Sequence, residues 1–534
     1  MKLRAAFPIV LTAVSFLRAD TYPRQSGVDV QHYLFRVTLG DDSDSITGET
    51  TVTVRFVQEG LAEWALDLAS PANGKGMTVT EVSSGAAPVP YTHEADRLRI
   101  SLRPPARAGE LRSFTVKYRG IPAGGLLTVK NKFGDRCFFS VNWPDLAHQW
   151  LPTIDHPYDK ATSEFIVTAP VKYQVVSNGL LQEQIDLGDG RRATHWKQSV
   201  PIAVWLDQIG VAQFASRHFG RAAGVPLETW VFPQDRDAGM ATLEEPTRRA
   251  IEFFRDHIGP YPYEKLAGVQ VAGMGGGMEV ASAIFYGERG ITGRPAYGLV
   301  AHETAHQWFG DSVTEKDWDD VWLSEGFATY FALLATEHYE GRDAFVAGLK
   351  SSRTRIFAAE KRLPGVAVVQ DKPWKGIPNQ IVYQKGGWSL HMLRGQIGTE
   401  KFWAGIREYY RRFRDGNAST ADFEKVMEEV SGSDLRWFFR QWLYRAGSPV
   451  LEGTWSYNSE ARKVEIDLAQ TEPGEAYRLP LEVAVAESGA APKIASIEMT
   501  AKQQRFELDA AKEPASVELD PHTWVLVDAR LARK

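Results

Sequence analysis

Hydrophobic and polar positions alternate through the first part of the chain. Between residues 20 and 213, stretches with an apolar side chain at every second position are separated by turns rich in Gly, Asp and Pro, which is typical of strands with one buried face. The clearest alternating positions are Tyr33, Phe35, Val37 and Leu39, then Val52, Val54 and Phe56, then Phe114, Val116 and Tyr118, then Phe165 and Val167. The pattern predicts a β-rich N-terminal domain over residues 20–213.

The apolar period changes to that of a helix after residue 213 and returns to that of strands near residue 450. Helical spacing is clearest in residues 250–254, 297–309, 322–339, 402–410 and 435–444. The helix stop Gly447-Ser448-Pro449 follows, and alternation resumes at residues 455–457, 464–468, 483–485, 517–519 and 524–527. We therefore predict an α+β multidomain fold, with a mainly helical domain over 214–446 and a small C-terminal β-sandwich over 447–534.

The first 19 residues have the pattern of a secretory signal peptide. Lys2 and Arg4 precede an apolar run over residues 5–17, which is too short to cross a bilayer. Pro8 and Arg18 interrupt the pattern, and a disordered leader is the alternative. No other stretch of the sequence is long and apolar enough for a membrane span. We therefore expect a secreted or periplasmic protein.

Composition narrows the class of protein without identifying it. The 534 residues correspond to roughly three or four ordinary domains, and 43% hydrophobic residues can fill their cores. A net charge of −6 argues against a nucleic-acid partner and against a polybasic membrane surface. The single cysteine, Cys137, cannot form an internal disulfide and is expected to be a buried apolar residue. The sequence does not fix the oligomeric state, and a monomer is the simplest expectation.

Residues 302–306 form an HExxH motif, which indicates a metal site. His302 and His306 are four residues apart on a predicted helix, so both imidazoles can reach one ion, while Glu303 is turned off that axis and can act as a base. After 18 intervening residues Glu325 lies near the start of the next helix. Two imidazoles, one carboxylate and an open fourth position predict one catalytic Zn2+ per chain. A chance match on a solvated helix and a structural zinc are the alternatives, but a structural zinc usually needs cysteine, and none is near.

The sequence around this motif resembles peptidase family M1, the gluzincin aminopeptidases. The stretch HETAHQWFGDSVTEKDWDDVWLSEGFATY, from His302 to Tyr330, is similar to the family's zinc-binding core. Further similarity lies in Gly276-Gly277-Met278-Glu279, which resembles the GxMEN exopeptidase motif, in Tyr383-Gln384-Lys385-Gly386, which resembles the segment of the catalytic tyrosine, and in residues 150–161, which resemble an N-terminal-domain signature. The resemblance implies a saddle-shaped β-rich N-terminal domain, a thermolysin-like catalytic domain and a zinc aminopeptidase acting on peptides with a free N-terminus.

The resemblance also implies roles for residues outside the HExxH motif. Tyr383 would donate a hydrogen bond to the oxyanion of the tetrahedral intermediate, with a buried core tyrosine as the alternative. Glu279 would pair with the free α-ammonium of the substrate, so that only the first peptide bond reaches the metal; an exposed acid after a glycine turn is the alternative. Gly276, Gly277 and Met278 would line the substrate, and the glycines would let the backbone approach it closely.

The chain departs from the family pattern in three places. Val280 stands where the exopeptidase motif usually ends in Asn, so a polar contact that orients this segment is missing. The N-terminal domain commonly supplies a Gln or Glu to the substrate pocket; here Asn142 is the obvious amide, and it either lines the pocket or caps a turn. The long helical C-terminal domain of most members is not expected, because the chain ends at Lys534.

A zinc-dependent aminopeptidase is therefore the function that the sequence favours. A zinc endopeptidase and an epoxide hydrolase of the same fold are the enzymatic alternatives. A catalytically silent scaffold is the third, although the ligands, the base and the tyrosine are all present. The preferred N-terminal residue, the length limit and the physiological peptide cannot be inferred, because the shape of the pocket depends on residues of two domains.

Overall fold

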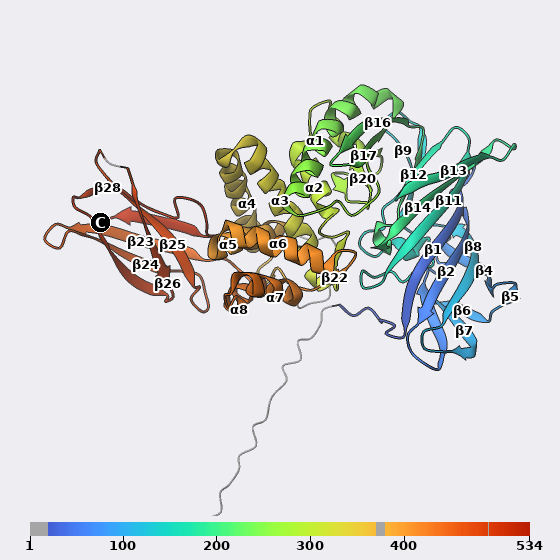
Figure 1. Ribbon diagram of the computed structural model, residues 1–534, viewed down its shortest axis with the longest axis horizontal. Coiled ribbons are helices and arrows are strands. Elements are labelled where there is room, and N and C mark those ends of the chain that lie inside the picture. The colour runs from blue at the N-terminus through green and yellow to red at the C-terminus, as the bar shows by residue number, and fades with distance from the viewer. Residues whose placement is uncertain (1–19, 370–379, 490) are drawn as a thin grey trace, which may run out of the picture.

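The computed structural model describes residues 20–369, 380–489 and 491–534, and Figure 1 shows three parts along the chain. A β-rich part in blue and teal is followed by a mainly helical part in green to orange and by a second β-rich part in red. The β-rich N-terminal region and the helical central region are therefore confirmed. The predicted signal peptide, residues 1–19, lies outside the described residues, and the predicted domain boundaries stay predictions.

The N-terminal part is built on an eight-stranded sheet with the order β13-β14-β11-β1-β2-β8-β4-β5. Strands β1 and β11 run parallel, with Phe35 opposite Phe165, and both rings are buried. The strands of this sheet are β1 (Val28–Thr38), β2 (Ile46–Phe56), β4 (Gly76–Ser84), β5 (Ala87–Pro88), β8 (Leu111–Ile121), β11 (Lys160–Pro170), β13 (Leu180–Asp186) and β14 (Arg191–Ala203). Alternate side chains along β1 and β2 are buried, as the alternating pattern predicts.

Two smaller sheets complete this part, with the orders β12-β15-β10-β9 and β3-β7-β6. Their strands are β3 (Leu61–Asp67), β6 (Tyr91–Glu94), β7 (Arg97–Ala106), β9 (Leu126–Lys130), β10 (Arg136–Ser140), β12 (Gln174–Ser177) and β15 (Ile209–Ala212). Two short 3-10 helices link the four-stranded sheet to the eight-stranded sheet: η1 (Ala147–Gln149) lies between β10 and β11, and η2 (Val204–Leu206) lies between β14 and β15. Cys137 on β10 is buried, as expected.

The central part begins with a five-stranded sheet of order β16-β17-β18-β20-β19, which the helical prediction for residues 214–446 omits. Its strands are β16 (Ala215–Ala222), β17 (Val225–Val231), β18 (Leu266–Val271), β19 (Gly277–Met278) and β20 (Ala283–Gly287). Every residue of β18 and β20 is buried, so these strands have no alternation between buried and exposed positions. Periodicity alone cannot separate such strands from buried helix.

Helices cover this sheet and form most of the central part (Figure 1). They are α1 (Arg236–His257), α2 (Tyr297–His306), α3 (Trp322–Glu340), α4 (Arg342–Arg362), α5 (Gly386–Ile397), α6 (Thr399–Phe413), α7 (Thr420–Ser431) and α8 (Arg436–Leu443), with short strands β21 (Val313–Glu315) and β22 (Gly416–Ala418), the 3-10 helices η3 (Pro233–Asp235), η4 (Glu288–Gly290) and η5 (Trp318–Asp320), and a π-helical turn, η6 (Ile381–Lys385). Within the part of the chain that the structure describes, no helix combines the length and the hydropathy that a membrane span requires.

The C-terminal part contains a sheet of order β27-β24-β23-β29 and a sheet of order β26-β25-β28. Their strands are β23 (Val450–Asn458), β24 (Lys463–Gln470), β25 (Leu479–Glu487), β26 (Lys493–Met499), β27 (Gln503–Asp509), β28 (Pro514–Leu519) and β29 (Asp528–Arg533). The predicted strand at 524–527 is wrong, because the carboxylate of Asp520 accepts hydrogen bonds from the backbone amides of Trp524 (2.7 Å) and Val525 (3.0 Å). The packing of the two sheets as a sandwich stays a prediction.

A half-buried lysine joins the N-terminal and central parts. Lys160, the first residue of β11, donates hydrogen bonds to the carbonyl oxygens of Asp311 (3.0 Å), Ser312 (2.8 Å) and Gly416 (3.2 Å). Burial lowers the pKa of Lys160 to about 8. Because two of these carbonyls belong to the loop between α2 and α3, this lysine fixes that loop against the N-terminal sheet.

Two glycines let α3 contact the beginning of α5. A methyl group at Gly326 would lie 2.9 Å from the backbone carbonyl carbon of Gly386, and one at Gly386 would lie 3.1 Å from the Cα of Gly326. Side chains at these positions would therefore separate the two helices. The close approach brings η6 beside the first turns of α3.

Gly326→Ala is expected to lower the free energy of unfolding by about 1–3 kcal/mol, because the added methyl group overpacks this contact. Gly298→Ala is the matched control, since Gly298 lies on α2 with nothing within 4 Å of the added carbon. Alanine there should leave stability unchanged or raise it by up to about 1 kcal/mol. Denaturant unfolding followed by tryptophan fluorescence measures both changes, and equal shifts for the two variants would contradict the packing argument.

Candidate metal centre

Helices α2 and α3 bring the three predicted metal ligands together. His302 and His306 lie one turn apart on α2, and Glu325 lies in the first turn of α3. The Nε2 atoms of the two histidines are 3.2 Å apart, and each of them is 3.4 Å from Oε2 of Glu325. Three side-chain atoms from two helices therefore form a nearly equilateral triangle.

The size of this triangle fits a tetrahedral zinc ion. Bonds of about 2.0–2.1 Å at tetrahedral angles place neighbouring ligand atoms roughly 3.3 Å apart. Oε2 of Glu325 is also buried without a hydrogen-bond partner among the described residues, and a bound cation would satisfy it. The predicted residues thus fit the predicted metal in donor type, spacing and charge.

Burial and proximity shift the pKa values of the three ligands. Burial by itself would raise the pKa of Glu325, but the two neighbouring imidazoles outweigh it and lower this pKa to about 2. Burial lowers the pKa of His302. Burial would also lower the pKa of His306, but the carboxylates of Glu279 and Glu325 reverse this effect and raise it well above its ordinary value. Glu325 is therefore held as a carboxylate, the form that binds a metal.

Two contacts orient the ring of His306. The hydroxyl oxygen of Ser324 lies 2.9 Å from Nδ1 of His306, and the carbonyl oxygen of Phe309 lies 3.3 Å from the same nitrogen. Partners on Nδ1 leave Nε2 directed toward the other ligands. Gly310 has a φ of 117°, and a methyl group there would collide with the Ser324 hydroxyl. Ser324 was not among the site residues predicted from the sequence, although it directly precedes Glu325.

The predicted base, Glu303, is enclosed next to the ligands. One donor atom each from Glu279, Glu303 and His306 lies within 4.8 Å of the other two. Burial, and then the charge of Glu279, raises the pKa of Glu303 well above its ordinary value. Gly277 on β19 packs directly against this carboxyl group, because a methyl group at Gly277 would collide with it. The glycine therefore sets the position of Glu303.

Gln307 holds the segment that carries Glu279. Its amide nitrogen donates to the carbonyl oxygen of Glu279 (3.0 Å) and to Oδ2 of Asp311 (2.8 Å), and its amide oxygen accepts from the backbone amide of Ser282 (2.8 Å). Val280 is fully buried. The segment is therefore oriented through its backbone by Gln307, where the family motif has a polar Asn side chain. The carboxyl group of Glu279 is buried 4.0 Å from Nδ1 of His306, and burial raises its pKa.

Tyr383 approaches the ligands from η6. Its hydroxyl group donates a hydrogen bond of 2.6 Å to Oε1 of Glu325, and its ring lies nearly parallel to that of His302, with 6.1 Å between the centroids. Burial and the charge of Glu325 raise the pKa of Tyr383 far above its ordinary value. The phenol therefore keeps its hydrogen and can serve as a donor.

The remaining predicted site residues, Gly276, Met278 and Asn142, differ in how far they are buried. Met278 is buried on β19, whereas Gly276 has a φ of 72° and nothing within 4 Å of the position that a Cβ would take. Asn142 is fully buried; its oxygen accepts from Nε1 of Trp150 (2.8 Å) and its amide nitrogen donates to the carbonyl oxygen of Asp207. These partners indicate a structural role for Asn142, and its contact with substrate stays a prediction.

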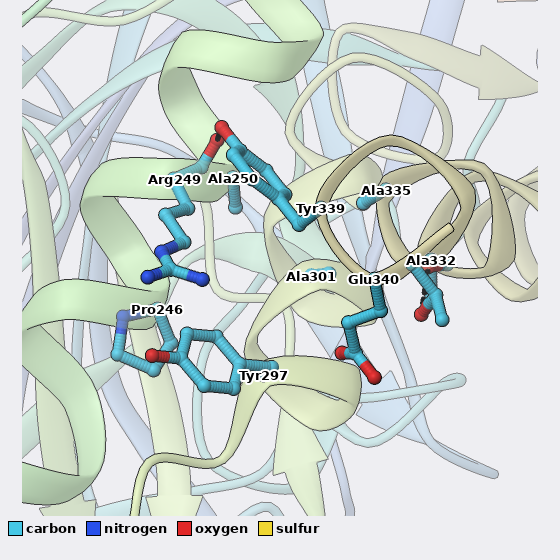
Figure 2. Close-up of a pocket in the computed structure, with 10 residues that line it drawn as sticks. Pro246, Arg249, Ala250, Tyr297, Ala301, Ala332, Ala335, Tyr339 and Glu340 are labelled. Atoms are coloured by element: carbon cyan, nitrogen blue, oxygen red, sulfur yellow. Dashed lines mark hydrogen bonds between the residues drawn. The ribbon is translucent and has the colours of Figure 1, made fainter. Parts of the chain in front are cut away.

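A small hollow lies between α1, α2 and α3 (Figure 2). Arg249 lies over the rings of Tyr297 and Tyr339, with its guanidinium carbon 4.7 and 5.2 Å from the two centroids. The hollow holds about 20 Å³, which is room for little more than one water molecule. No predicted site residue lines it, so it is not part of the metal centre.

A pair of helices that supplies HExxH and a distant glutamate, behind a β-rich N-terminal part, defines the gluzincin class of zinc sites. Residues 243–442 match the peptidase family M1 domain, and residues 30–206 match the peptidase M1 N-terminal domain. The chain belongs to peptidase family M1.

Curated relatives share the same region of this chain. It is 30% identical over 330 residues to glutamyl aminopeptidase of Sus scrofa and 29% identical over 332 residues to tricorn protease-interacting factor F2 of Thermoplasma volcanium. These matches cover 58% and 57% of this chain. The chain spans only 34% and 40% of the length of those two relatives.

Solved structures extend the similarity to 78–79% of this chain. The M1 zinc metallopeptidase of Deinococcus radiodurans is 26% identical, with a TM-score of 0.68 over 78% of this chain and 94% of that chain. A variant of that protein bound to a Tyr-Ser-Ala substrate is 27% identical, with a TM-score of 0.68 over 79% of this chain and 96% of that chain. These similarities agree with the β-rich N-terminal part and the helical central part described above.

Gly277→Ala is expected to displace the carboxyl group of Glu303 and to lower kcat for an aminoacyl anilide by about 10-fold or more, because proton transfer depends on the position of the base. Gly275→Ala is the control, since nothing lies within 4 Å of its added carbon. Steady-state kinetics and metal analysis measure both variants. The same kcat for Gly277→Ala and Gly275→Ala would contradict the assigned contact.

Proposed function

We propose that this chain is a zinc-dependent aminopeptidase that removes the N-terminal residue of peptides, with Glu303 as general base and Tyr383 stabilising the oxyanion. The observation that carries the proposal is the triangle of donor atoms, 3.2 to 3.4 Å on each side, with the carboxyl groups of Glu303 and Glu279 beside it. A base and an ammonium-binding acid next to one metal position are the groups that an exopeptidase needs.

Peptide hydrolysis at this site needs a Lewis acid and a general base. His302, His306 and Glu325 would hold the zinc ion, which would supply a Lewis acid for the scissile carbonyl group and for the attacking water. Glu303 takes a proton from the attacking water and passes it to the leaving amine. The position of the Glu303 carboxyl group, held against Gly277 and close to His306, supports this role.

Tyr383 acts on the oxygen that gains negative charge. A phenol that donates a hydrogen bond to this oxygen stabilises the transition state more than the neutral carbonyl of the substrate. The contact of 2.6 Å with Glu325 supports this role, since it keeps the phenol next to the ligands. The raised pKa of Tyr383 supports it as well, because only the protonated phenol donates.

Glu279 limits cleavage to the first residue. Its carboxylate pairs with the α-ammonium of the substrate, so only the first peptide bond reaches the base. Relatives named glutamyl aminopeptidase and a two-domain M1 zinc metallopeptidase bound to L-tryptophan support this reading, because a free amino acid is the product that an aminopeptidase releases. Peptides with a free N-terminus are therefore the proposed substrates. Export from the cytoplasm is part of the proposal and rests on the signal pattern of residues 1–19.

Glu279→Gln is expected to lower kcat/KM for free dipeptides and aminoacyl anilides by roughly 30-fold or more, because the buried ion pair with the ammonium group is lost. Wild-type protein should hydrolyse these substrates, fail with a chelator, recover with zinc and leave N-acetylated peptides intact. Glu340→Gln, on an exposed acid at the end of α3, is the control and should match wild type.

Each alternative function gives a different result in the same assays. Cleavage of N-acetylated peptides at internal bonds would contradict the exopeptidase assignment and favour an endopeptidase. Hydrolysis of an epoxide without peptide cleavage would favour the epoxide hydrolase. A zinc-loaded protein that hydrolyses neither would be a silent scaffold, and the proposal would be wrong.

A further inference from the structure

Lys385 is a fully buried lysine two residues beyond Tyr383. Its ammonium group donates to Oε1 of Glu360 on α4 (3.1 Å) and to the carbonyl oxygen of Gly447 (2.5 Å), and it lies 3.5 Å from the carbonyl oxygen of Arg445. A lysine that is buried this deeply loses its hydration and is retained only where such partners replace it. Lys385 therefore holds the C-terminal end of η6 against α4 and against residues 445–447.

The acceptors of Lys385 are themselves held in place. Oε1 of Glu360 also accepts a hydrogen bond from the hydroxyl group of Ser448 (2.8 Å), and the carbonyl oxygen of Gly447 also accepts one from the hydroxyl group of Tyr477 (2.9 Å). Residues 444–449, which we call the junction, connect α8 to β23 of the C-terminal part. The anchor of Lys385 thus joins η6, α4 and the junction.

The turn that Lys385 anchors is the turn that carries Tyr383. Residues Ile381–Lys385 form a π-helical turn, a rare conformation that occurs frequently at functional sites. A π-helical turn persists where side-chain contacts hold it, and Lys385 supplies such contacts at its last residue. The Gly326–Gly386 contact holds the same turn from the side of α3.

We infer that Lys385 is a positioning residue for Tyr383: its bonds to Glu360 and to the junction fix the π-helical turn so that the phenol meets the metal ligands. Lys385 does not touch substrate or metal; it acts through the tyrosine. The inference rests on the proposed function of Tyr383. The inference also links the junction before the C-terminal part to the position of Tyr383. One hydrogen-bond acceptor of Lys385, the carbonyl oxygen of Gly447, lies in this junction.

A double-mutant cycle tests this coupling. Lys385→Met is expected to lower kcat by about 10-fold or more with KM changed by less than about 3-fold, because a displaced phenol weakens stabilisation of the oxyanion. In a Tyr383→Phe background the same substitution should lower kcat by less than about 2-fold, since the group that Lys385 positions is already gone. Zinc content should equal that of wild type in each variant.

A readout independent of activity accompanies the cycle. Hydrogen exchange of the backbone amides in residues 381–389 should accelerate in Lys385→Met. Ile466→Ala, at a fully buried position of β24, is the control for general destabilisation; it should lower the unfolding midpoint yet leave kcat and this exchange unchanged. If Lys385→Met does not fold, Glu360→Gln takes its place, with an expected decrease in kcat of about 3-fold that also vanishes in the Tyr383→Phe background.

The possible failures are distinguishable. If Lys385→Met lowers kcat by the same factor with and without the Tyr383 hydroxyl, or leaves kcat and exchange unchanged, Lys385 does not position the tyrosine and only this inference is overturned. If Tyr383→Phe alone leaves kcat unchanged, the proposed role of Tyr383 is overturned and the inference with it.

Discussion

The site depends on how closely α2 and α3 approach each other. Two of the three donor atoms come from α2 and one comes from α3, and the sides of their triangle, 3.2 to 3.4 Å, match the roughly 3.3 Å that a tetrahedral zinc requires. Such sites tolerate only about 0.5 Å of displacement. Gly310 leaves room for the Ser324 hydroxyl group beside His306, and Gly326 lets the start of α5 contact α3. The fold around the pair therefore sets the chemistry.

Three buried carboxyl groups lie close together at the site, and this proximity is the second physical constraint on it. Glu279, Glu303 and Glu325 are each only 5% exposed and lie within one small volume. Carboxylates in such surroundings either take up protons or recruit cations. The shifts in pKa follow this rule: Glu325 stays ionised beside two imidazoles, while burial raises the pKa of Glu279 and Glu303. In the proposed function, a metal ion and the ammonium group of a peptide are the two cations that neutralise this charge.

The chemistry of the site could be predicted from the sequence because it is encoded over short distances. Residues four apart on one helix must face the same way, so His302 and His306 were identifiable, and the start of the next apolar helix marked Glu325. Ser324, Gln307 and Lys385 were not identified, because their roles depend on which distant segments the fold brings against them. Strands β18 and β20 were missed because they are buried on both faces and show no period of two. The strand predicted at 524–527 was wrong because Asp520 accepts hydrogen bonds from the backbone amides of Trp524 and Val525.

The central claim is that two imidazoles and one carboxylate of this chain bind one zinc ion. The zinc K-edge X-ray absorption spectrum of purified protein loaded with one equivalent of zinc tests it most directly. The account predicts a four-coordinate ion with two imidazole nitrogens and oxygen ligands, at bond lengths of about 2.0–2.1 Å, and loss of the carboxylate contribution in Glu325→Gln. Protein that retains no stoichiometric zinc, or zinc with a sulfur ligand or a single imidazole, would contradict it.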